Sequence, residues 1–490
     1  MPLFHLPVEI VELVFDEIVI SHNFVRVMRT RLVNSQFKRF IDSSIFRLGI
    51  LCDQLNTNDY SLQLGMCSPR ESLPYIHSYV MYRVLREQPT AATCLGRIRH
   101  AGQVLGGSDD DLECLSSLVS LALACNKRAT VVNAYSALGD TGVDVFVAAA
   151  YLGRKDYVSS KLITKNIASG GRFSLKSIHS KVFGSPLRAA TVQGNLEMIK
   201  LLLSHDSPGN ILGTNSASLL HGNSSHKERG NTCDHEPVFN FIFDMMLRSR
   251  AHFGDRPPFV WALGDALSHA ATPKSFERAL ALLPPSLGSS TEKLQAALLR
   301  SVKNGKIMMV GHLLNKGVSP NLDDTYPTPL MEAIRNGDDL IFKMLLDFGA
   351  DPAPQTMLLN RGPGSAQQMN SPLMTAVWLG RLAMAKTLLD RGVDPNDGYP
   401  APIVLALYKE RLDIFRLLKD HGARLDKLET GTFAMLIAER HGLSSMQDVL
   451  FREGVSSEHD VSLEDILLHK GLNPEYDLSM QEASFYDNLL

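Results

Sequence analysis

Four side chains that could bind a metal lie close together in one polar stretch of the sequence. Residues 206–237 are rich in Gly, Ser, Asn and His, and they include His221, His226, Cys233 and His235. Imidazole and thiolate groups are common zinc ligands, but the spacing of these four residues matches none of the usual zinc motifs. We therefore interpret the stretch as a polar insertion and expect the protein to bind no metal.

The chain also lacks the sequence patterns of the common enzyme families. It contains no G-x-x-x-x-G-K-[ST], G-x-S-x-G or H-E-x-x-H motif and no dinucleotide-binding fingerprint. Gly106, Gly107 and Ser108 precede three acidic residues, which would repel a phosphate instead of binding it. We expect a protein without catalytic residues or a cofactor. An unrecognised enzyme stays a third interpretation, because catalytic groups also assemble across a fold.

The composition is that of an ordinary folded protein. Of its 490 residues, 44% are hydrophobic and 21% are charged, and the net charge of -3 gives no general attraction to nucleic acid or anionic membranes. The six cysteines form no C-x-x-C pair, which favours a reducing compartment. The amino terminus lacks the basic segment of a secretory signal, and the apolar run LSSLVSLALAC is too short to span a bilayer. We predict a soluble protein of the cytoplasm, the nucleus or both, with no direct nucleic-acid or membrane binding.

One stretch of the sequence predicts a pair of helices, and related copies of it recur along the chain. Within residues 328–352, Thr328 and Pro329 are typical of a helix start, and Gly337 ends this first helix. A second helix follows and ends at Gly349. Its predicted buried face contains four apolar residues: Leu340, Ile341, Met344 and Leu345. Recurrence at about 33 residues indicates stacked repeats and not one closed core.

The copies share residues at fixed positions. The central copy has Thr-Pro-Leu at its start, Gly337 between the helices, a Leu-Leu pair, and Gly-Ala-Asp after the second helix. Further copies begin at Ser185, Ser371, Ala401 and Gly431. In one more copy, Gly305 and Gly317 each lie 32 residues before the corresponding glycine of the central copy. This pattern resembles the ankyrin repeat, and the chain resembles fungal-type ankyrin-repeat regulators. The resemblance implies an all-α solenoid of helix pairs with hairpin loops, which binds proteins and not small substrates.

The residues just before the glycine between the two helices face the concave binding surface in the ankyrin family. Two positions before this glycine, or before its substitute Glu410, the successive copies have Lys303, Arg335, Trp378, Tyr408 and Arg440. We call these five residues the ladder. We expect the ladder to form one basic and aromatic strip that binds an acidic and apolar segment of a partner protein. The alternative is that Trp378 and Tyr408 pack against each other or against the hairpins while the basic residues are only solvated.

The first 50 residues predict a separate helical segment. The sequence resembles an F-box, first at Leu6, Pro7, Glu9 and Ile10 and later at Lys38, Arg39 and Ile41. In that family the apolar faces bind the Skp adaptor of a cullin ubiquitin ligase. The resemblance implies such binding here through Leu6, Pro7, Ile10, Val14 and Phe37. The alternative is an amino-terminal helical cap that only covers the end of the solenoid.

The predicted organisation has five parts. They are the F-box-like segment (1–50), a helical region with or without degenerate repeats (51–180), repeats with the polar insertion (181–290), further repeats (291–455) and a tail (456–490). The tail has eight acidic residues against Lys470, and this composition is typical of partner-docking segments. It would recruit partners, fold back onto the ladder, or simply cap the last repeat.

The predicted function is that of a non-enzymatic regulator. Its repeats would hold a partner protein, and the whole chain would act as an F-box-type substrate adaptor of a ubiquitin ligase. The alternative is a nuclear transcription coregulator whose repeats hold a transcription factor.

Overall fold

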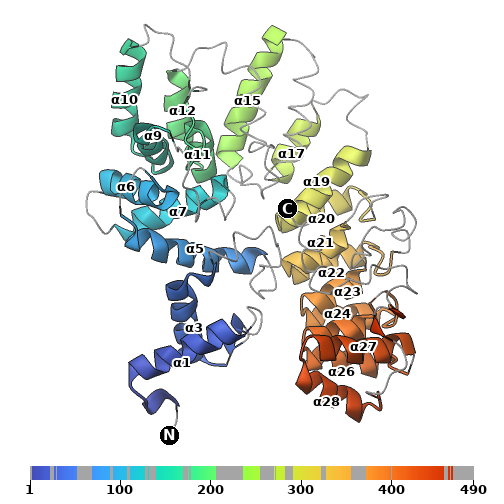
Figure 1. The fold of residues 1–490 in the computed structure, drawn as a ribbon. Coiled ribbons are helices and arrows are strands. Elements are labelled where there is room, and N and C mark those ends of the chain that lie inside the picture. The colour runs from blue at the N-terminus through green and yellow to red at the C-terminus, as the bar shows by residue number, and fades with distance from the viewer. Residues whose placement is uncertain are drawn as a thin grey trace. The chain divides into compact units, whose positions relative to one another are not determined.

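The described part of the chain is almost entirely helical. The computed structural model describes residues 3–466 except 23–26, 29, 32, 52–68, 89–91, 107–110, 127–130, 132–138, 169–174, 176–177, 206–235, 254–269, 271, 282–290, 322–326, 355–370, 399, 427, 457–461 and 464. These residues form 21 α-helices, a short 3-10 helix and no strand (Figure 1). The all-α class predicted from the sequence is therefore confirmed. The chain falls into two compact units that meet in sequence between Ala297 and Leu298.

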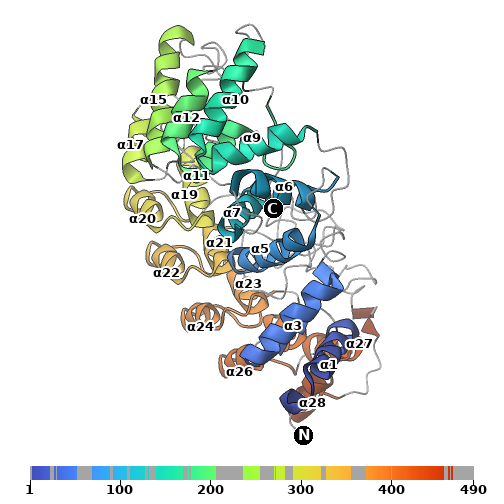
Figure 2. The ribbon, with the colours of Figure 1, turned by 90° about the vertical axis from the view of Figure 1, so that its left-hand side faces the viewer.

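The carboxyl-terminal unit is a series of five helix pairs. The first helices of the pairs are α19 (Thr291–Lys303), α21 (Pro329–Asn336), α23 (Pro372–Trp378), α25 (Pro402–Tyr408) and α27 (Leu428–Arg440). The second helices are α20 (Ile307–Asn315), α22 (Asp339–Asp347), α24 (Leu382–Asp390), α26 (Leu412–Asp420) and α28 (Ser444–Arg452). First helices pack on first helices, as α21, α23 and α25 do. Figure 2 shows the second helices following one another in a separate row. The unit is therefore a helical repeat solenoid.

Local sequence explains where the helices begin and which faces they bury. Thr328 accepts a hydrogen bond of 3.2 Å from the backbone N–H of Met331, and the following proline needs no donor partner. The four buried residues of α22 are Ile341, Phe342, Leu345 and Leu346. The predicted buried face was wrong at Leu340, which is 64% exposed. The buried residues recur at Ile341, Phe342, Leu345 and Leu346, so one narrow stripe of the helix contacts its neighbours and Leu340 lies outside this stripe.

The turn between the two helices of a pair is where neighbouring pairs interlock. Gly337 and Gly380 both adopt left-handed backbone conformations, with φ of 70° and 68°. A Cβ added to Gly337 would lie 2.7 Å from the guanidinium carbon of Arg381, which belongs to the following pair. Arg411 repeats this arrangement one pair later, and it donates a hydrogen bond of 3.1 Å to the carbonyl of Gly380. The backbone angle therefore favours glycine at these two turns, and a larger residue would also displace the end of the arginine side chain.

Asparagine side chains hold the hairpins of neighbouring pairs together. Asn321 donates to the carbonyl of Gly349 at 2.9 Å and accepts from the N–H of Asp351 at 2.8 Å. Asn396 makes the same two bonds to the next hairpin, with Gly422 at 3.2 Å and Arg424 at 2.8 Å. Ala353 occupies the equivalent position in the central copy, so this bridge cannot form there.

The amino-terminal unit contains two helix pairs of the same kind. They are α9 (Thr141–Tyr151) with α10 (Lys155–Ala168), and α11 (Pro186–Gln193) with α12 (Leu196–Ser204). Gly153 has φ of 74°, and a Cβ on it would lie 2.9 Å from the side-chain nitrogen of Asn195 in the next pair. The other helices of this unit are α1 (Val8–Ser21), α3 (Ser35–Leu48), α5 (Pro69–Arg86), α6 (Cys94–Gly106), α7 (Leu112–Cys125), α15 (Glu236–Phe253) and α17 (Pro273–Leu280). The sequence did not predict α15.

A buried ion pair joins α6 to α9. Arg97 and Asp144 are both almost fully buried, and their charged groups lie 2.6 Å apart. The hydroxyl of Ser180 donates to the other oxygen of Asp144 at 2.6 Å, and Arg97 also donates to the carbonyl of Gly139 at 2.8 Å. Burial raises the pKa of Asp144, although the bonds from Ser180 and Arg97 oppose this shift. Burial likewise raises the pKa of the neighbouring Cys94 thiol to about 12, so this cysteine is an unreactive core residue.

We predict that Asp144→Ala destabilises the amino-terminal unit by about 3–5 kcal/mol, because it leaves the Arg97 guanidinium buried without its carboxylate. Asp156→Ala, at an exposed position on α10, is the matched control and should change stability by about 0.5 kcal/mol or less. Hydrogen exchange of α6 and α9 measures the effect. Equal exchange in the two variants would contradict the role of the pair.

A second prediction concerns the polar link between α24 and α26. Nδ1 of His421 lies 2.9 Å from the carbonyl of Leu417, and its Nε2 lies 3.2 Å from Asp390. These two hydrogen bonds raise the pKa of His421, and the same contact lowers the pKa of Asp390. The histidine contribution is complete below about pH 6.5 and is lost as pH rises through the folded pKa. The aspartate contribution is present above about pH 3.9 and is lost as pH falls through its own folded pKa.

The link should therefore stabilise the repeats most between about pH 4 and pH 6.5. Asp390→Asn should lower the pKa of His421, as measured from the imidazole proton shifts in an NMR titration. Asp347→Asn removes a carboxylate that faces Arg391 at 3.1 Å instead, and it should leave this pKa unchanged. An unaltered His421 titration in Asp390→Asn would disprove the link.

Candidate functional site

The aromatic members of the ladder stack on each other. The rings of Trp378, at the end of α23, and Tyr408, at the end of α25, have centroids 5.8 Å apart and planes inclined by 13°. His441 meets Tyr408 edge-on, with ring centroids 5.0 Å apart. The ammonium of Lys409 lies 3.7 Å from the centroid of Trp378. As a result Trp378 is only 4% exposed, whereas Tyr408, Lys409 and His441 are half-buried.

The basic members of the ladder differ from one another in burial. Arg335 is 1% exposed, and it donates a hydrogen bond of 3.3 Å to Glu332, which is also buried. Lys303 approaches the same oxygen of Glu332 from the preceding pair, at 3.8 Å, with its side chain nearly half exposed. Arg440 is exposed. The structure thus places Arg335 inside the repeats and leaves Lys303 and Arg440 on the surface.

In three pairs, the residue that immediately precedes the inter-helix turn contacts the ladder residue of the pair before it. Lys409 covers Trp378, and His441 covers Tyr408. Asn336 does the same with hydrogen bonds of 3.0 and 3.1 Å to the carbonyls of Val302 and Lys303. The sequence analysis missed Lys409, His441 and Glu332. The signal for the first two was available, since they occupy the position next to the ladder in the same register.

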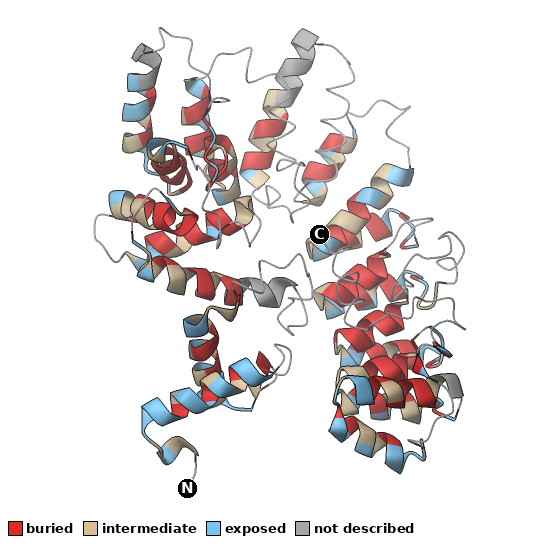
Figure 3. Ribbon diagram, viewed as in Figure 1, coloured by how far each residue is buried: buried red, intermediate tan, exposed pale blue. Residues whose placement is uncertain are grey.

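The amino-terminal helix α1 presents a second unusual surface. Its buried residues Val11, Phe15 and Val19 face α3. Five other large apolar residues of α1 are exposed: Val8, Ile10, Leu13, Val14 and Ile20. Leu13 and Ile20 are each 63% exposed, and Figure 3 shows much of this helix in the colour of exposed residues. The helix is therefore apolar on two sides, of which only one is buried within the described residues.

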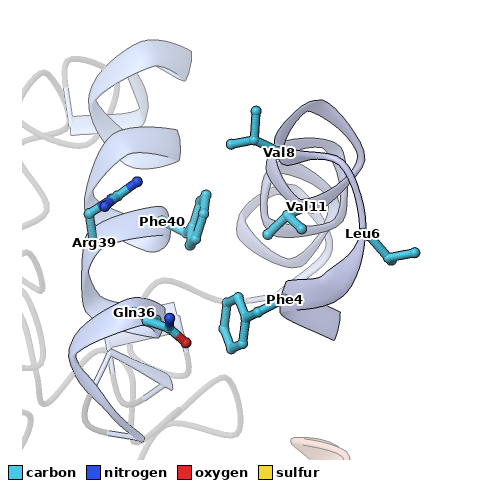
Figure 4. A pocket seen from close by; sticks show the side chains of 7 residues that line it. All are labelled: Phe4, Leu6, Val8, Val11, Gln36, Arg39 and Phe40. Atoms are coloured by element: carbon cyan, nitrogen blue, oxygen red, sulfur yellow. The ribbon is translucent and has the colours of Figure 1, made fainter. Parts of the chain in front are cut away.

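The predicted adaptor-binding residues occupy different places on this hairpin of α1 and α3. Ile10 and Val14 lie on the exposed apolar face, and Pro7 immediately precedes α1. Phe37 instead packs inside the hairpin, edge-on to Phe15 with ring centroids 5.1 Å apart. Leu6 lies at a notch of about 160 Å³ between the two helices (Figure 4). The other residues that line the notch are Phe4, Val8, Val11, Gln36, Arg39 and Phe40.

The hairpin contacts α5 through the aromatic ring of Phe46 and through Arg31, whose guanidinium lies 4.4 Å from the centroid of the Tyr75 ring. Phe46 of α3 lies 5.3 to 5.4 Å, between ring centroids, from Tyr75, Tyr79 and Tyr82 of α5. Arg47 of the same helix binds Glu12 at 2.7 Å and Asp16 at 2.8 Å. These contacts fix α1 with its apolar face outward.

Two of the sequence predictions fall outside the described residues. They are the possible metal ligands between His221 and His235, and most of the tail from Ser456. No helix among the described residues is both long enough and apolar enough to cross a membrane.

Comparison with known proteins shows what this chain is similar to. A family model for ankyrin repeats in three copies matches residues 298–399, which include α20 to α24. The chain contains ankyrin repeats. A putative ankyrin repeat-containing protein of Treponema pallidum (strain Nichols) is 35% identical over 130 residues, which cover 26% of this chain and 40% of that protein. The crystal structure of the human ASB11 ankyrin repeat domain is 20% identical, with 46% of this chain and 96% of that chain covered and a TM-score of 0.29. The match to ankyrin repeats in residues 298–399 indicates a protein-interaction module there.

We predict that replacement of the buried basic residue of the ladder lowers stability much more than replacement of an exposed one. Arg335→Ala should lower the free energy of unfolding of the repeats by about 3–5 kcal/mol, because Glu332 stays buried without this partner. Arg440→Ala should change it by about 0.5 kcal/mol or less, because its side chain is exposed. Chemical denaturation followed by circular dichroism compares the two. A small effect of Arg335→Ala would show that the buried Arg335 does not stabilise the repeats.

Proposed function

We propose that this protein is a non-enzymatic regulator that binds two proteins, one on its ankyrin repeats and one on its amino-terminal hairpin. The repeats bind a partner along the row of first helices, where Lys303, Tyr408 and Arg440 are at least partly accessible. The hairpin of α1 and α3 binds a Skp-type adaptor of a cullin ubiquitin ligase. The exposed apolar face of α1 is the observation that carries the proposal.

An apolar helix face of this kind favours protein binding. Burial of apolar surface contributes about 25 cal/mol per Å², and large exposed apolar patches are typical of interaction sites. The helix also carries Glu9, Glu12, Asp16 and Glu17 and no lysine or arginine. Anionic membranes attract basic helices, so this charge favours a protein partner over a membrane surface.

Fewer observations support the ligase role than support the binding of a protein. The F-box resemblance supports it through Ile10 and Val14, which lie on the exposed face of α1. The chain spans 40% of the length of the curated relative that it matches, and that relative's printed description names only its repeats. The coregulator alternative relies on the acidic tail, most of which lies outside the described residues.

The test is direct binding of the full-length chain to a purified Skp-type adaptor. Replacement of Leu13 and Val14 by aspartate should weaken binding at least tenfold, because two central apolar contacts become charged. Ile163→Asp changes an equally exposed apolar residue on α10 and is the matched control. Circular dichroism should show unchanged helix content in both variants.

Two outcomes would count against the ligase role. If the wild-type chain does not bind the adaptor, α1 serves as a cap or binds another protein. If both variants bind equally well, the adaptor uses another surface. Recovery of a transcription factor on the repeats, without ligase subunits, would support the coregulator alternative.

A further inference from the structure

Three exposed apolar residues of α1 share one line along the helix with a glutamate. We call these four residues the α1 stripe, and they are Ile10, Leu13, Glu17 and Ile20. They are spaced by three, four and three residues, and all four are exposed. Because an α-helix has about 3.6 residues per turn, residues at these spacings lie on one face. The same spacing forms the contact seam of paired helices, so the stripe has the pattern of a surface that packs lengthwise against another helix.

The α1 stripe lies on the side of the helix that faces away from α3. Phe15 and Val19 belong to the buried side, and Glu17 is two residues from each of them, which is about 200° around the helix. Leu13 and Ile20 are each 63% exposed. The contact with α3 therefore uses one side of α1 and leaves the stripe accessible along its length.

Glu17 places a charge in the middle of this apolar surface. Leu13 and Val14 lie four and three residues before it and Ile20 lies three residues after it, so apolar side chains surround it on the helix surface. Arg47 binds two other acids of α1, whereas no ion pair or hydrogen bond joins the Glu17 side chain to another described residue. A wholly apolar partner would remove water from this carboxylate and leave the charge unpaired, which is strongly unfavourable.

The cations of the hairpin are engaged or placed elsewhere. The α1 helix itself has no lysine or arginine. Arg31 binds Asp42 at 3.0 Å, Arg47 binds the acids on the flank of α1, and Arg39 lies at the notch between the two helices. Lys38 is exposed on α3, and within the described part of the chain it forms no ion pair with α1. The charge on the stripe itself is therefore negative, and it favours a cation from the partner.

Three other occupants fit the α1 stripe poorly. In a parallel pair of two copies of α1, equivalent residues meet, so Glu17 would face Glu17. In an antiparallel pair centred on the stripe, each Glu17 would face Leu13 of the other copy and lose its water without gaining a cation. The carboxyl-terminal tail has eight acidic residues against Lys470, and anionic membranes attract basic helices and not acidic ones. A second copy, the tail and a membrane are therefore all disfavoured.

We propose that the α1 stripe binds one amphipathic helix of a partner protein lengthwise, and that this helix carries a lysine or arginine opposite Glu17. Ile10, Leu13 and Ile20 contact apolar residues that recur in the partner at spacings of three and four. The pairing of Glu17 with the cation fixes the register of the two helices, as a single polar residue does in the seam of a coiled coil. This inference rests on the proposed function of α1 as a protein-binding surface, and it adds the chemistry of the partner.

The test selects binders for the full-length chain from a displayed library of helix-forming peptides, three heptads long, whose seam positions are randomised. Counter-selection with the Leu13→Asp/Val14→Asp variant removes peptides that bind elsewhere on the chain. The wild-type chain should enrich peptides with an apolar seam and one central lysine or arginine. Glu17→Lys should instead enrich aspartate or glutamate at that position. Glu9→Lys makes the same charge change at an exposed acid of α1 outside the stripe, and it should still select a cation.

A fluorescein-labelled copy of the best peptide then gives affinities by anisotropy. Glu17→Lys should weaken binding about tenfold or more, because two like charges then meet in a contact that excludes water. Replacement of the cation of the peptide by glutamate should restore binding to Glu17→Lys to within about threefold of the original pair. A variant with a damaged α1 would bind neither peptide, so this exchange separates a direct charge contact from a change in fold.

The outcomes distinguish this inference from the function on which it rests. Adaptor binding that requires Leu13 and Val14 and is unchanged in Glu17→Lys would leave the proposed function intact and overturn the inference. Selected peptides with a wholly apolar or acidic seam would also overturn it, as would equal effects of Glu17→Lys and Glu9→Lys on affinity. Dimers of the wild-type chain in analytical ultracentrifugation that Leu13→Asp/Val14→Asp abolishes would show that a second copy occupies the stripe, and would overturn both.

Discussion

The turn between the two helices of each pair is the feature on which the repeats depend. Its left-handed backbone lets the second helix fold back on the first, and the next pair places a side chain directly on it. At Gly337 and Gly380 that side chain is an arginine, and at Gly153 it is Asn195. One small residue therefore sets the backbone of its own pair and the stacking of the next. Because each pair in a solenoid contacts only its neighbours, these turns help to fix how consecutive pairs align.

The sequence predicts this architecture well because the required residues are specific. A helix start with Thr328 or Ser371 followed by proline, combined with a glycine at most of the turns, fits few folds besides stacked helix pairs. The positions of the ladder residues could be predicted from the sequence, but their burial could not. Whether Arg335 is solvated or buried depends on Glu332 and on the neighbouring pairs, which the spacing of one repeat does not reveal. The buried ion pair of Arg97 and Asp144 could not be predicted either, because its two residues lie far apart in sequence.

The two surfaces of the proposed function differ in their chemistry. The face of α1 is apolar and bordered by acidic residues, and it is already exposed in the form that a partner would meet. The ladder is basic and aromatic, and its rings are covered by Lys409 and His441. A partner of α1 would gain mainly from burial of apolar area.

The hairpin bridges of Asn321 and Asn396 suggest where this array accepts added length. Ala353 stands where these two asparagines do, and 21 residues separate Gly349 from the next helix start at Ser371, against ten between Gly317 and Thr328. A bridge of two hydrogen bonds fixes both the distance and the angle between consecutive hairpins, so extra residues there would strain it. Without the bridge, the stacking of α21 on α23 and the bonds from Arg391 to Asp347 and Leu346 still join the two pairs. Evolution could thus lengthen this one loop without altering the pitch of the solenoid.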